Sequence, residues 1–296
     1  MPPAEHFAAP PNWEWWILGY FFFGGLSGGS YAIGTLMRLV GAPSDARLSR
    51  AAFIVSFLAL IPCPIFLVLD LGQPLRFLNM LVDASNGGLA FKPWSPMSVG
   101  AWALLFFGLF SFVSFLGALA EMGTVRALAP IARFFRGPLE TVWNIVGTGL
   151  GFFICGYTGV LLAVSNQPVW SDGWPLGGMF LASALSGSAA LLLLVARSRR
   201  DVESGSAMRL EAADRNFVII EAILIAIFLA TVALAGTINK VLGVWIVLWI
   251  VVILGLLAPF VLTRGALARR MPVAGPAIAL LGVLALRALV IFSAQT

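Results

Sequence analysis

The stretch Leu67–Trp102 reads LVLDLGQPLRFLNMLVDASNGGLAFKPWSPMSVGAW and separates two strongly apolar segments. Asp70 ends the first segment, and Gly72-Gln73-Pro74 stops the helix there, because proline has no N–H group and clashes with the preceding turn. The second segment begins at Ser95-Pro96, where serine is a typical N-cap and proline suits the first helical position. The sequence therefore predicts two long helices joined by a polar loop.

Asp70 and Arg76 indicate that this loop carries a site. Arg76 follows Asp70 by six residues, close enough in sequence for the two side chains to pair. A carboxylate at the rim of hydrocarbon is costly without a partner, so an acid and a base placed together there point to function. The alternative is that the pair only staples the loop.

The composition excludes an ordinary soluble domain. Of the 296 residues, 60% are hydrophobic and only 10% are charged. The net charge of +5 does not indicate nucleic acid, because the basic residues are spread over loops without an aromatic or glycine-rich binding surface. We expect an all-α integral membrane protein that forms a bundle of about eight transmembrane helices of roughly 20 residues each.

Eight apolar segments follow one another along a single transmembrane domain, residues 1–296. The first four, about 15–165, form the half expected to carry the site, and the last four, about 176–291, form a supporting half. The segments are roughly Trp15–Val40, Ala51–Leu71, Pro96–Ala120, Val142–Val164, Leu176–Ala196, Phe217–Ile238, Leu242–Leu262 and Val273–Ile291.

The basic residues are distributed unevenly between the two sides of this topology. Only Arg76, Lys92 and Lys240 fall in loops on one side. The positive-inside rule therefore places the Arg-rich loops in the cytoplasm and both termini outside it, in a prokaryotic cytoplasmic (inner) membrane. The other side holds fourteen arginines: Arg38, Arg47, Arg50, Arg126, Arg133, Arg136, Arg197, Arg199, Arg200, Arg209, Arg215, Arg264, Arg269 and Arg270.

Tryptophans gather on the extracytoplasmic side of the same topology. We interpret them as an aromatic belt at the outer membrane interface, with contact to a partner subunit as the alternative. They are Trp13, Trp15, Trp16, Trp94, Trp102, Trp170 and Trp174.

Small residues dominate the middle of the first span, which contains Gly24–Ser30 (GGLSGGS) and then Gly34. No strand precedes this run, so it does not match a phosphate-binding loop. Glycine and serine let helix backbones approach closely in lipid, and we expect close helix packing here. Pro62 and Pro64 should bend the second span ahead of Asp70.

Ionisable residues within the spans are few, and four polar groups fall at a similar depth. Glu14, Asp70 and Arg287 lie towards the outer face, and Tyr157 lies at the same height on the fourth span. Intramembrane ionisable groups usually mark functional sites. The sequence predicts that these groups share one layer, without showing that they share one pocket.

Two further acids lie nearer the cytoplasmic side. Glu121 falls at the inner end of its helix and is expected to be solvated. Glu221 lies about one turn inside the sixth expected span, where it could take up protons from the cytoplasm or pair with a neighbouring arginine. These two acids leave open whether the protein also pumps protons.

The sequence offers no ligands for heme or for an iron–sulfur cluster. The single histidine is His6, in the N-terminal tail, and Cys63 and Cys155 are isolated within apolar runs. A diheme membrane cytochrome takes its axial ligands from its helices, usually histidine, and iron–sulfur clusters need several cysteine thiolates. We therefore expect no metal site in this chain, and any electron carrier within it should be an organic molecule.

Several motifs together resemble the NrfD/polysulfide-reductase membrane-subunit family over nearly the whole chain. They are Trp15–Ile33, Asp70–Phe77 (DLGQPLRF), Ser95–Trp102 (SPMSVGAW), Tyr157–Leu162 (YTGVLL) and the last span with Arg287. The resemblance implies eight helices without heme and a quinone bound near the outer face. It also implies two partners, a ferredoxin-like iron–sulfur subunit and a molybdopterin catalytic subunit.

The resemblance also implies roles for individual residues. Asp70 and Arg76 would belong to the quinone region and its proton exit, and Tyr157 would donate a hydrogen bond to a quinone carbonyl. Related proteins can place a histidine near the start of the first helix for the other carbonyl. This chain has none there, so Glu14 or Asn12 would replace it, and the expected proton-handling groups are Asp70, Tyr157 and Glu14.

These observations favour a quinone- or quinol-reactive membrane anchor of a multi-subunit respiratory oxidoreductase. The quinone would be menaquinone or ubiquinone drawn from the quinone pool of the bilayer, and the chain would do no chemistry on the final substrate. Two other classes compete with this interpretation. A secondary transporter also has broken helices and isolated charges, but its polar groups usually lie at mid-depth. A purely structural anchor is the other alternative.

Overall fold

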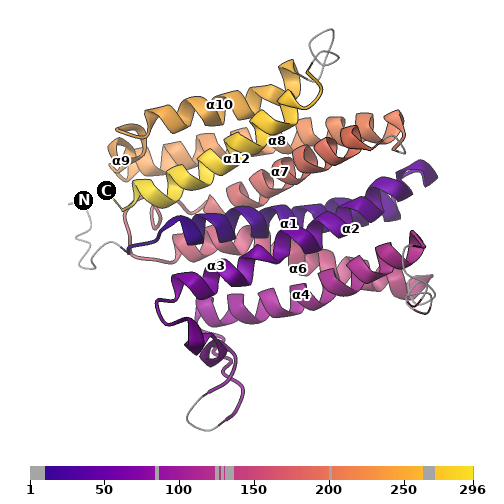
Figure 1. Cartoon of the computed structure of the whole chain (residues 1–296). Helices are drawn as coiled ribbons and strands as arrows, with labels where there is room; N and C mark the ends of the chain where they lie inside the picture. The colour runs from indigo at the N-terminus through magenta and orange to yellow at the C-terminus, as the bar shows by residue number, and fades with distance from the viewer. Residues whose placement is uncertain are drawn as a thin grey trace.

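The computed structural model describes residues 11–83, 87–123, 127, 130, 137–199, 202–262 and 271–295 (Figure 1). Its long helices are α1 (Trp15–Leu39), α2 (Ala46–Leu60), α3 (Pro62–Asp70), α4 (Pro96–Glu121), α6 (Pro138–Ala163), α7 (Leu176–Ser198), α8 (Ser204–Leu234), α10 (Ile246–Val261) and α12 (Ala274–Ser293). Shorter elements are the 3-10 turns η1 (Pro43–Asp45) and η2 (Pro74–Met80) and the helix α9 (Ile238–Leu242). The predicted all-α fold is confirmed.

Six helical segments among the described residues are long and apolar enough to cross a membrane. They are Pro43–Asp70, Pro96–Glu121, Pro138–Ala163, Leu176–Ser198, Ser204–Leu234 and Ala274–Ser293. Eight crossings require α1, with 25 residues, and the shorter apolar helix α10, with 16. A multi-span helical protein is therefore confirmed, and the count of eight stays a prediction.

Two helix boundaries lie at prolines that the sequence analysis singled out, Pro62 and Pro96. The second span divides at Ile61 into α2 and α3, and Pro62 begins α3, as expected for a proline-induced bend. Pro96 begins α4, and the Ser95 hydroxyl accepts a hydrogen bond from the Ser98 N–H at 3.4 Å. The predicted N-cap is therefore present.

The start of α8 differs from expectation. The helix begins at Ser204, thirteen residues before the expected start at Phe217. The preceding residues, SGSAMRLEAADRN, are polar, so hydropathy excludes them, yet many of them favour helix. Glu221 consequently lies near the middle of a 31-residue helix rather than one turn from its start.

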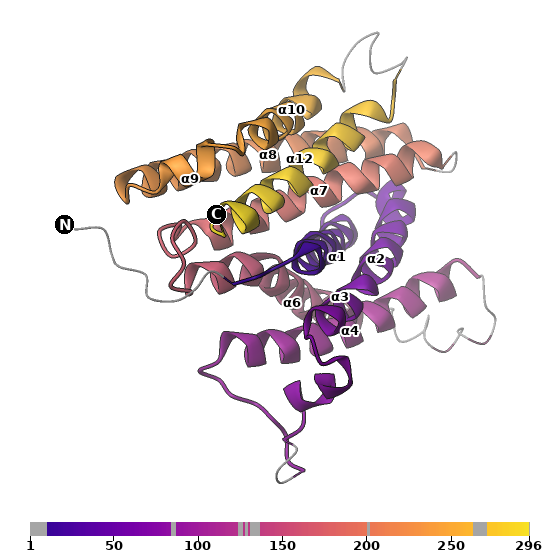
Figure 2. The ribbon, with the colours of Figure 1, turned by 60° about the vertical axis from the view of Figure 1, so that its left-hand side comes forward.

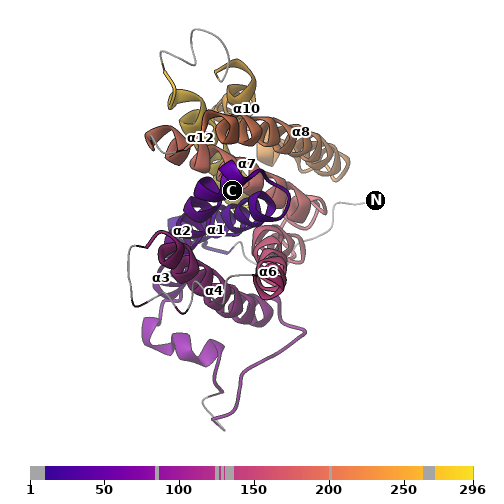
Figure 3. The same cartoon turned by 90° about the vertical axis from the view of Figure 1, so that its right-hand side faces the viewer.

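Helix α1 is the centre of the bundle. It packs against α2, α3, α6, α7 and α12. Figures 1 and 3 show α3 and α4 on one side of it and α8, α10 and α12 on the other. The part of the chain that joins α3 to α4 extends away from the helices (Figure 2).

The glycines of α1 permit this central position. A side chain at Gly28 would collide with the carbonyl oxygen of Gly151 on α6, and one at Gly29 would collide with Ser188 on α7. One at Gly34 would approach Ala52 on α2. Because different glycines meet different helices, the expectation of close backbone packing along this run is confirmed.

Both ends of the described chain lie at the same end of the bundle, here called the termini end. The Trp13 N–H donates to the Gln295 side-chain oxygen at 2.8 Å, and the Gln295 amide nitrogen donates to the Trp13 carbonyl at 3.1 Å. Common placement of the termini agrees with an even number of crossings. The side of the membrane that they face stays a prediction.

The opposite end, here called the arginine end, is held by ion pairs. Arg38 of α1 binds Glu121 of α4 at 2.8 Å and also binds Glu140 of α6. Glu121 is therefore an ion-paired link between helices, and the expectation that it is solvated was wrong. The reason is that α1 ends beside α4, which brings a guanidinium to that carboxylate.

Part of the predicted charge pattern lies outside the described residues. Arg197 of α7 pairs with Glu211 of α8 at 2.6 Å at this end of the bundle, and Arg209 pairs with Asp45. Seven arginines predicted to be cytoplasmic lie outside the described residues: Arg126, Arg133, Arg136, Arg200, Arg264, Arg269 and Arg270. His6 of the N-terminal tail also lies outside them.

We predict that Gly28→Ala destabilises the protein by about 1–3 kcal/mol, because the added methyl group would overlap the Gly151 carbonyl and lie 2.7 Å from the Cys155 sulfur. Gly149→Ala on α6 is the matched control, since nothing lies within 4 Å of its new methyl group. Thermal unfolding of the detergent-solubilised chain measures both. Equal stability of the two variants would contradict the packing argument.

Candidate functional site

Asp70 lies at a rim of the bundle at the termini end. It is the last residue of α3, and Gly72 follows in the left-handed conformation, with φ of +66°, which turns the chain out of the helix. The Asp70 side chain is half-buried. The glycine and proline that suggested a helix end in the sequence therefore place one carboxylate at a rim of the bundle.

Glu14 and Asn12 lie in the same corner. Glu14 occupies the N-cap position of α1, and its carboxylate acts electrostatically on Asp70. The Asn12 amide nitrogen donates to a Glu14 carboxylate oxygen at 3.5 Å. The structure thus brings together three of the predicted site residues, two acids and one amide.

Arg76 does not join them. It lies exposed on η2, and no ion pair connects it to Asp70 within the part of the chain that the structure describes. The expected pairing of Asp70 with Arg76 was wrong. The physical reason is that η2 leads the chain away from the helices, so the guanidinium is hydrated and needs no partner.

Tyr157 of α6 is nearly buried against α4. Its hydroxyl donates to the Pro96 carbonyl oxygen at 2.7 Å, and its ring stacks with Phe153 at a centroid distance of 5.4 Å. A side chain at Gly100 would collide with the Tyr157 ring. The motif SPMSVGAW thus provides both the acceptor for this tyrosine and the space for its ring.

The same motif anchors the loop that precedes it. The Ser98 hydroxyl donates to the Ala90 carbonyl at 3.3 Å and accepts from the Lys92 N–H at 3.0 Å. The Trp102 indole N–H donates to the same Ala90 carbonyl at 3.3 Å. The last residues of the loop are therefore fixed to the first two turns of α4.

A second tyrosine belongs to this region, and sequence reasoning missed it. Tyr20 is buried on α1 and lies close enough to Tyr157 and Cys63 for electrostatic interaction with both. It stands in the apolar run WWILGYFFF, where it has the appearance of a core aromatic residue. Its position as a polar aromatic residue within a span, close to motifs that carry charges, could have identified it as a candidate site residue.

Arg287 is at the same height but on the other side of α1. Its Nε donates to the Phe21 carbonyl at 3.2 Å, and Phe21 follows Tyr20 directly in the chain. Its Nη1 donates to the Ser183 hydroxyl at 2.9 Å. The predicted polar layer is thus divided by α1 into a corner containing Asp70 and a separate buried arginine.

The predicted tryptophan belt is divided in a similar way. Trp15, Trp94 and Trp174 are exposed at the termini end, which suits a membrane interface or a partner. Trp170 is instead buried, with its indole N–H bonded to the Val290 carbonyl at 2.7 Å, and Trp13 packs on it at 5.0 Å. Some belt residues therefore hold the bundle together.

No group of three or more histidine, cysteine, aspartate or glutamate side chains could hold a metal ion among the described residues. Cys63 and Cys155 are both buried as free thiols. The carboxylates of the Asp70 corner can accept hydrogen bonds and exchange protons beside an apolar helix surface.

Comparison with known families identifies the family of the chain. The profile of the polysulphide reductase family NrfD matches residues 5–296. The protein belongs to the NrfD family. The resemblance carried by the motifs of α1, α3, α4 and α6 is therefore confirmed.

Two curated relatives are similar to this NrfD protein. The C component of polysulfide reductase from Wolinella succinogenes is 29% identical over 196 residues, which are 62% of this chain and 57% of the relative. The C component of selenate reductase from Mesobacillus selenatarsenatis is 29% identical over 96 residues, which are 32% of this chain and 20% of the relative. The matches thus span little more than half of the first relative and a fifth of the second.

We predict that Gly100→Ala displaces the Tyr157 ring and destabilises the protein by about 1–3 kcal/mol, because the methyl group would lie 2.6 Å from a ring carbon. The control is Gly108→Ala on the same helix, where the nearest atom, on Leu60, lies 3.8 Å away. Thermal unfolding compares the two variants. A Gly100→Ala protein as stable as the control would show that the ring is free to move.

Proposed function

We propose that this protein is the quinone-reactive membrane anchor subunit of a multi-subunit respiratory oxidoreductase in the prokaryotic cytoplasmic membrane. The observation that carries the proposal is the corner of Asp70, Glu14 and Asn12 at the termini end of an NrfD-family helix bundle. Asp70 belongs to the first half of the helices, about 15–165, and Asn12 and Glu14 directly precede that half. The chain itself does no chemistry on the final substrate.

The surroundings of Asp70 suit a quinone of the menaquinone or ubiquinone class. A quinone needs an apolar surface for its tail and polar groups near its carbonyls. Leu69 and Trp16 expose apolar surface on α3 and α1, and the Trp16 ring lies 5.9 Å from the Phe66 ring. The half-buried carboxylate of Asp70 thus stands beside an apolar helix face that opens towards lipid.

In this proposal the residues of the corner handle protons. A bound quinol supplies two electrons and two protons. Asp70 accepts the two protons one after the other at its carboxylate, and Glu14, which is exposed, passes each of them to water. Asn12 orients Glu14 through their hydrogen bond. Tyr157 takes part by exchanging its Pro96 partner for a quinone carbonyl.

The electrons pass to partners at the same end of the bundle. The segment joining α3 to α4 extends beyond the helices and exposes Leu75 (95%) and Trp94 (79%). We propose that a ferredoxin-like iron–sulfur subunit docks there and serves a molybdopterin catalytic subunit. Arg76, exposed next to Leu75, is placed to contact that partner. Both relatives are named as single components of reductases, which supports a role within a complex.

We predict that Asp70→Asn lowers quinol-linked turnover by about tenfold or more, because the amide cannot accept the proton. Glu203→Gln, at an exposed acid before α8, should leave turnover unchanged. The measurement is quinol oxidation by the purified complex, with co-purification of the partner subunits recorded in parallel. Unchanged turnover would remove Asp70 from the mechanism, and loss of the partners would assign it a structural role.

We also predict that purification in mild detergent from the native membrane yields this chain together with an iron-containing and a molybdenum-containing subunit and with a quinone. Mass spectrometry of the subunits, metal analysis and quinone extraction measure the three components. A chain that elutes alone without iron or quinone would favour a secondary transporter instead.

A further inference from the structure

The end of helix α12 lies against the segment that carries two residues of the proposed quinone corner. This segment, residues 11–14, directly precedes α1 and is not helical. It carries Asn12 and Glu14, which lie in the corner with Asp70. Outside a helix or a sheet, the backbone of such a segment must find its hydrogen-bond partners in neighbouring elements or in water. The position of Glu14 therefore depends on what holds this segment.

The start of the helix does not explain the glutamate at position 14. Glu14 is the N-cap residue of α1, where serine, threonine, aspartate and asparagine are preferred because their short side chains bond the first N–H groups. Its side chain makes no capping bond to the described residues of α1. The carboxylate instead accepts a hydrogen bond from Asn12 and acts electrostatically on Asp70. The Glu14 side chain thus belongs to the corner rather than to the helix.

A single carboxamide holds the backbone between Asn12 and Glu14. The Gln295 oxygen accepts from the Trp13 N–H at 2.8 Å, and the Gln295 nitrogen donates to the Trp13 carbonyl at 3.1 Å. The same nitrogen also donates to the Ile291 carbonyl of α12 at 3.1 Å. These partners fix the orientation of the amide, because its oxygen faces a donor and its nitrogen faces two acceptors. Trp13 is thus bonded through both of its backbone groups.

The extended backbone directs neighbouring side chains to opposite sides. Glu14 has φ of −99° and ψ of −168°, in the extended region, where successive side chains point to opposite faces. Trp13 is half-buried, and its ring lies 5.0 Å from the Trp170 ring and 6.1 Å from the Phe21 ring. Asn12 and Glu14 are exposed. Holding Trp13 against the bundle therefore turns the two polar side chains to the other side of the segment.

Helix α12 also contacts the residue that follows Glu14. The Trp15 ring lies 5.1 Å from the Phe292 ring, at an interplanar angle of 60°. Glu14 thus lies between two residues that the end of α12 contacts, one through its backbone and the other through its ring. Because a rotation of the segment would break both contacts, the direction of the Glu14 carboxylate depends on α12.

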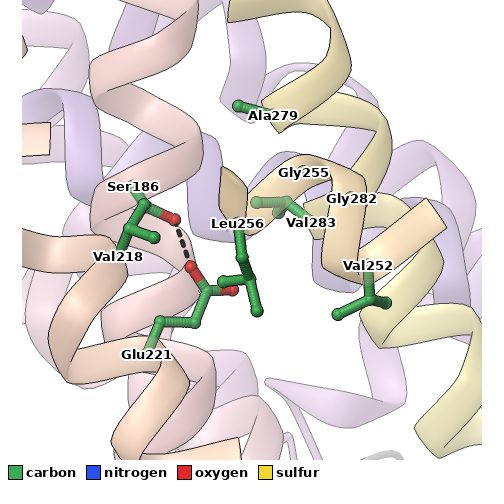
Figure 4. Close-up of a pocket in the computed structure, with 9 residues that line it drawn as sticks. All are labelled: Ser186, Val218, Glu221, Val252, Gly255, Leu256, Ala279, Gly282 and Val283. Atoms are coloured by element: carbon green, nitrogen blue, oxygen red, sulfur yellow. Dashed lines mark hydrogen bonds between the residues drawn. The ribbon is translucent and has the colours of Figure 1, made fainter. Parts of the chain in front are cut away.

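Helix α12 is itself held closely by its neighbours. Gly282 of α12 meets Gly255 of α10, where an added β-carbon would lie 2.6 Å from the Gly282 Cα (Figure 4). Nearer its end, the Val290 carbonyl accepts from the Trp170 indole N–H at 2.7 Å. The last turns of α12 are therefore a fixed support for the segment before α1. This support comes from the half of the chain that does not carry Asp70.

We propose that Gln295 is a positioning residue of the quinol reaction, whose carboxamide fixes the Trp13 backbone and thereby holds the Glu14 carboxylate in place to take protons from Asp70. This inference rests on the proposed function. In each transfer the proton leaves the Asp70 carboxyl, binds the Glu14 carboxylate and then passes to water, so that both acids return to their starting state. Gln295 exchanges no proton itself and acts only through the position of Glu14.

The first test measures hydrogen–deuterium exchange in the peptide of residues 12–18 within the purified complex. In this peptide the Trp13 N–H is bonded to Gln295, and the Leu18 N–H is bonded to the Glu14 carbonyl. Gln295→Met removes both bonds to Trp13 at a similar side-chain length. We expect one amide of the peptide to exchange at least about fivefold faster. Unchanged exchange would overturn the proposal.

Thr237→Val is the matched control for this substitution. It removes one side-chain hydrogen bond at the same end of the bundle, from the Thr237 hydroxyl to Asp172 at 2.9 Å. Asp172 keeps its bond from the Val169 N–H at 3.0 Å. We expect both the exchange of residues 12–18 and the quinol turnover to stay as in the unmodified complex. The same acceleration in this control would overturn the specific role of Gln295.

The second test compares kcat and KM for quinol in the unmodified complex, Gln295→Met, Glu14→Gln and the double variant. We expect Gln295→Met to lower kcat about tenfold and to leave KM within about twofold, because a misplaced proton acceptor slows transfer without weakening quinol binding. In the Glu14→Gln background the same substitution should change kcat by less than about twofold, because Gln295 acts through Glu14. Equal losses in both backgrounds would show a merely structural role and overturn the proposal.

A milder variant repeats the comparison if Gln295→Met lowers the yield of the complex. Gln295→Glu keeps an oxygen that accepts from the Trp13 N–H but lacks the donor to the Trp13 carbonyl. Its kcat should be lower than that of the unmodified complex, and the loss should again disappear in the Glu14→Gln background. A loss that persists in that background would overturn the proposal for this variant as well.

Failure of this inference is distinguishable from failure of the proposed function. If the unmodified complex oxidises quinol and Glu14→Gln lowers kcat while Gln295→Met does not, the proposed function stands and the role of Gln295 is overturned. If the unmodified complex oxidises no quinol, or if Glu14→Gln leaves kcat unchanged, the proposed role of Glu14 fails and the role of Gln295 fails with it.

Discussion

Close contact between helix backbones at the glycines of α1 is the constraint on which the rest of the structure depends. Lipid provides no hydrophobic force between helices, so their association relies on packing and internal hydrogen bonds. Gly28 admits the carbonyl of Gly151 from α6, and Gly29 admits Ser188 from α7, whose hydroxyl donates to the Leu26 carbonyl at 3.0 Å. A bulky residue at either position would separate α1 from one of its neighbours.

Helix α1 packs against helices of both halves of the chain, and its two faces contact different polar groups at the same height in the bundle. Tyr20 faces Tyr157 and Cys63, on the side of the Asp70 corner, while the Phe21 carbonyl binds Arg287 on the other side. The helix thus separates a carboxylate corner at the rim from the buried Arg287 and the serine that it binds.

The sequence was informative wherever a local rule decides the structure. Hydropathy predicted the helices, Ser95-Pro96 predicted where α4 begins, and Pro62 and Pro64 predicted a bend in the second span, since capping and proline geometry act over a few residues. Contacts between segments that lie far apart in the sequence were harder to predict. The spacing of Asp70 and Arg76 in the sequence does not determine the direction of η2, which keeps the two side chains from pairing. The first turns of α8 are polar, so hydropathy placed the start of this helix too late and Glu221 too close to it.

Gly25 shows how the central helix connects the two halves of the chain. A β-carbon there would lie 2.8 Å from the Nη2 atom of Arg287, so the missing side chain is what lets the guanidinium lie against α1. From that position Arg287 binds Ser183, which interacts with Glu221 on α8. The glycine run therefore brings the backbones together and also determines where the buried positive charge lies.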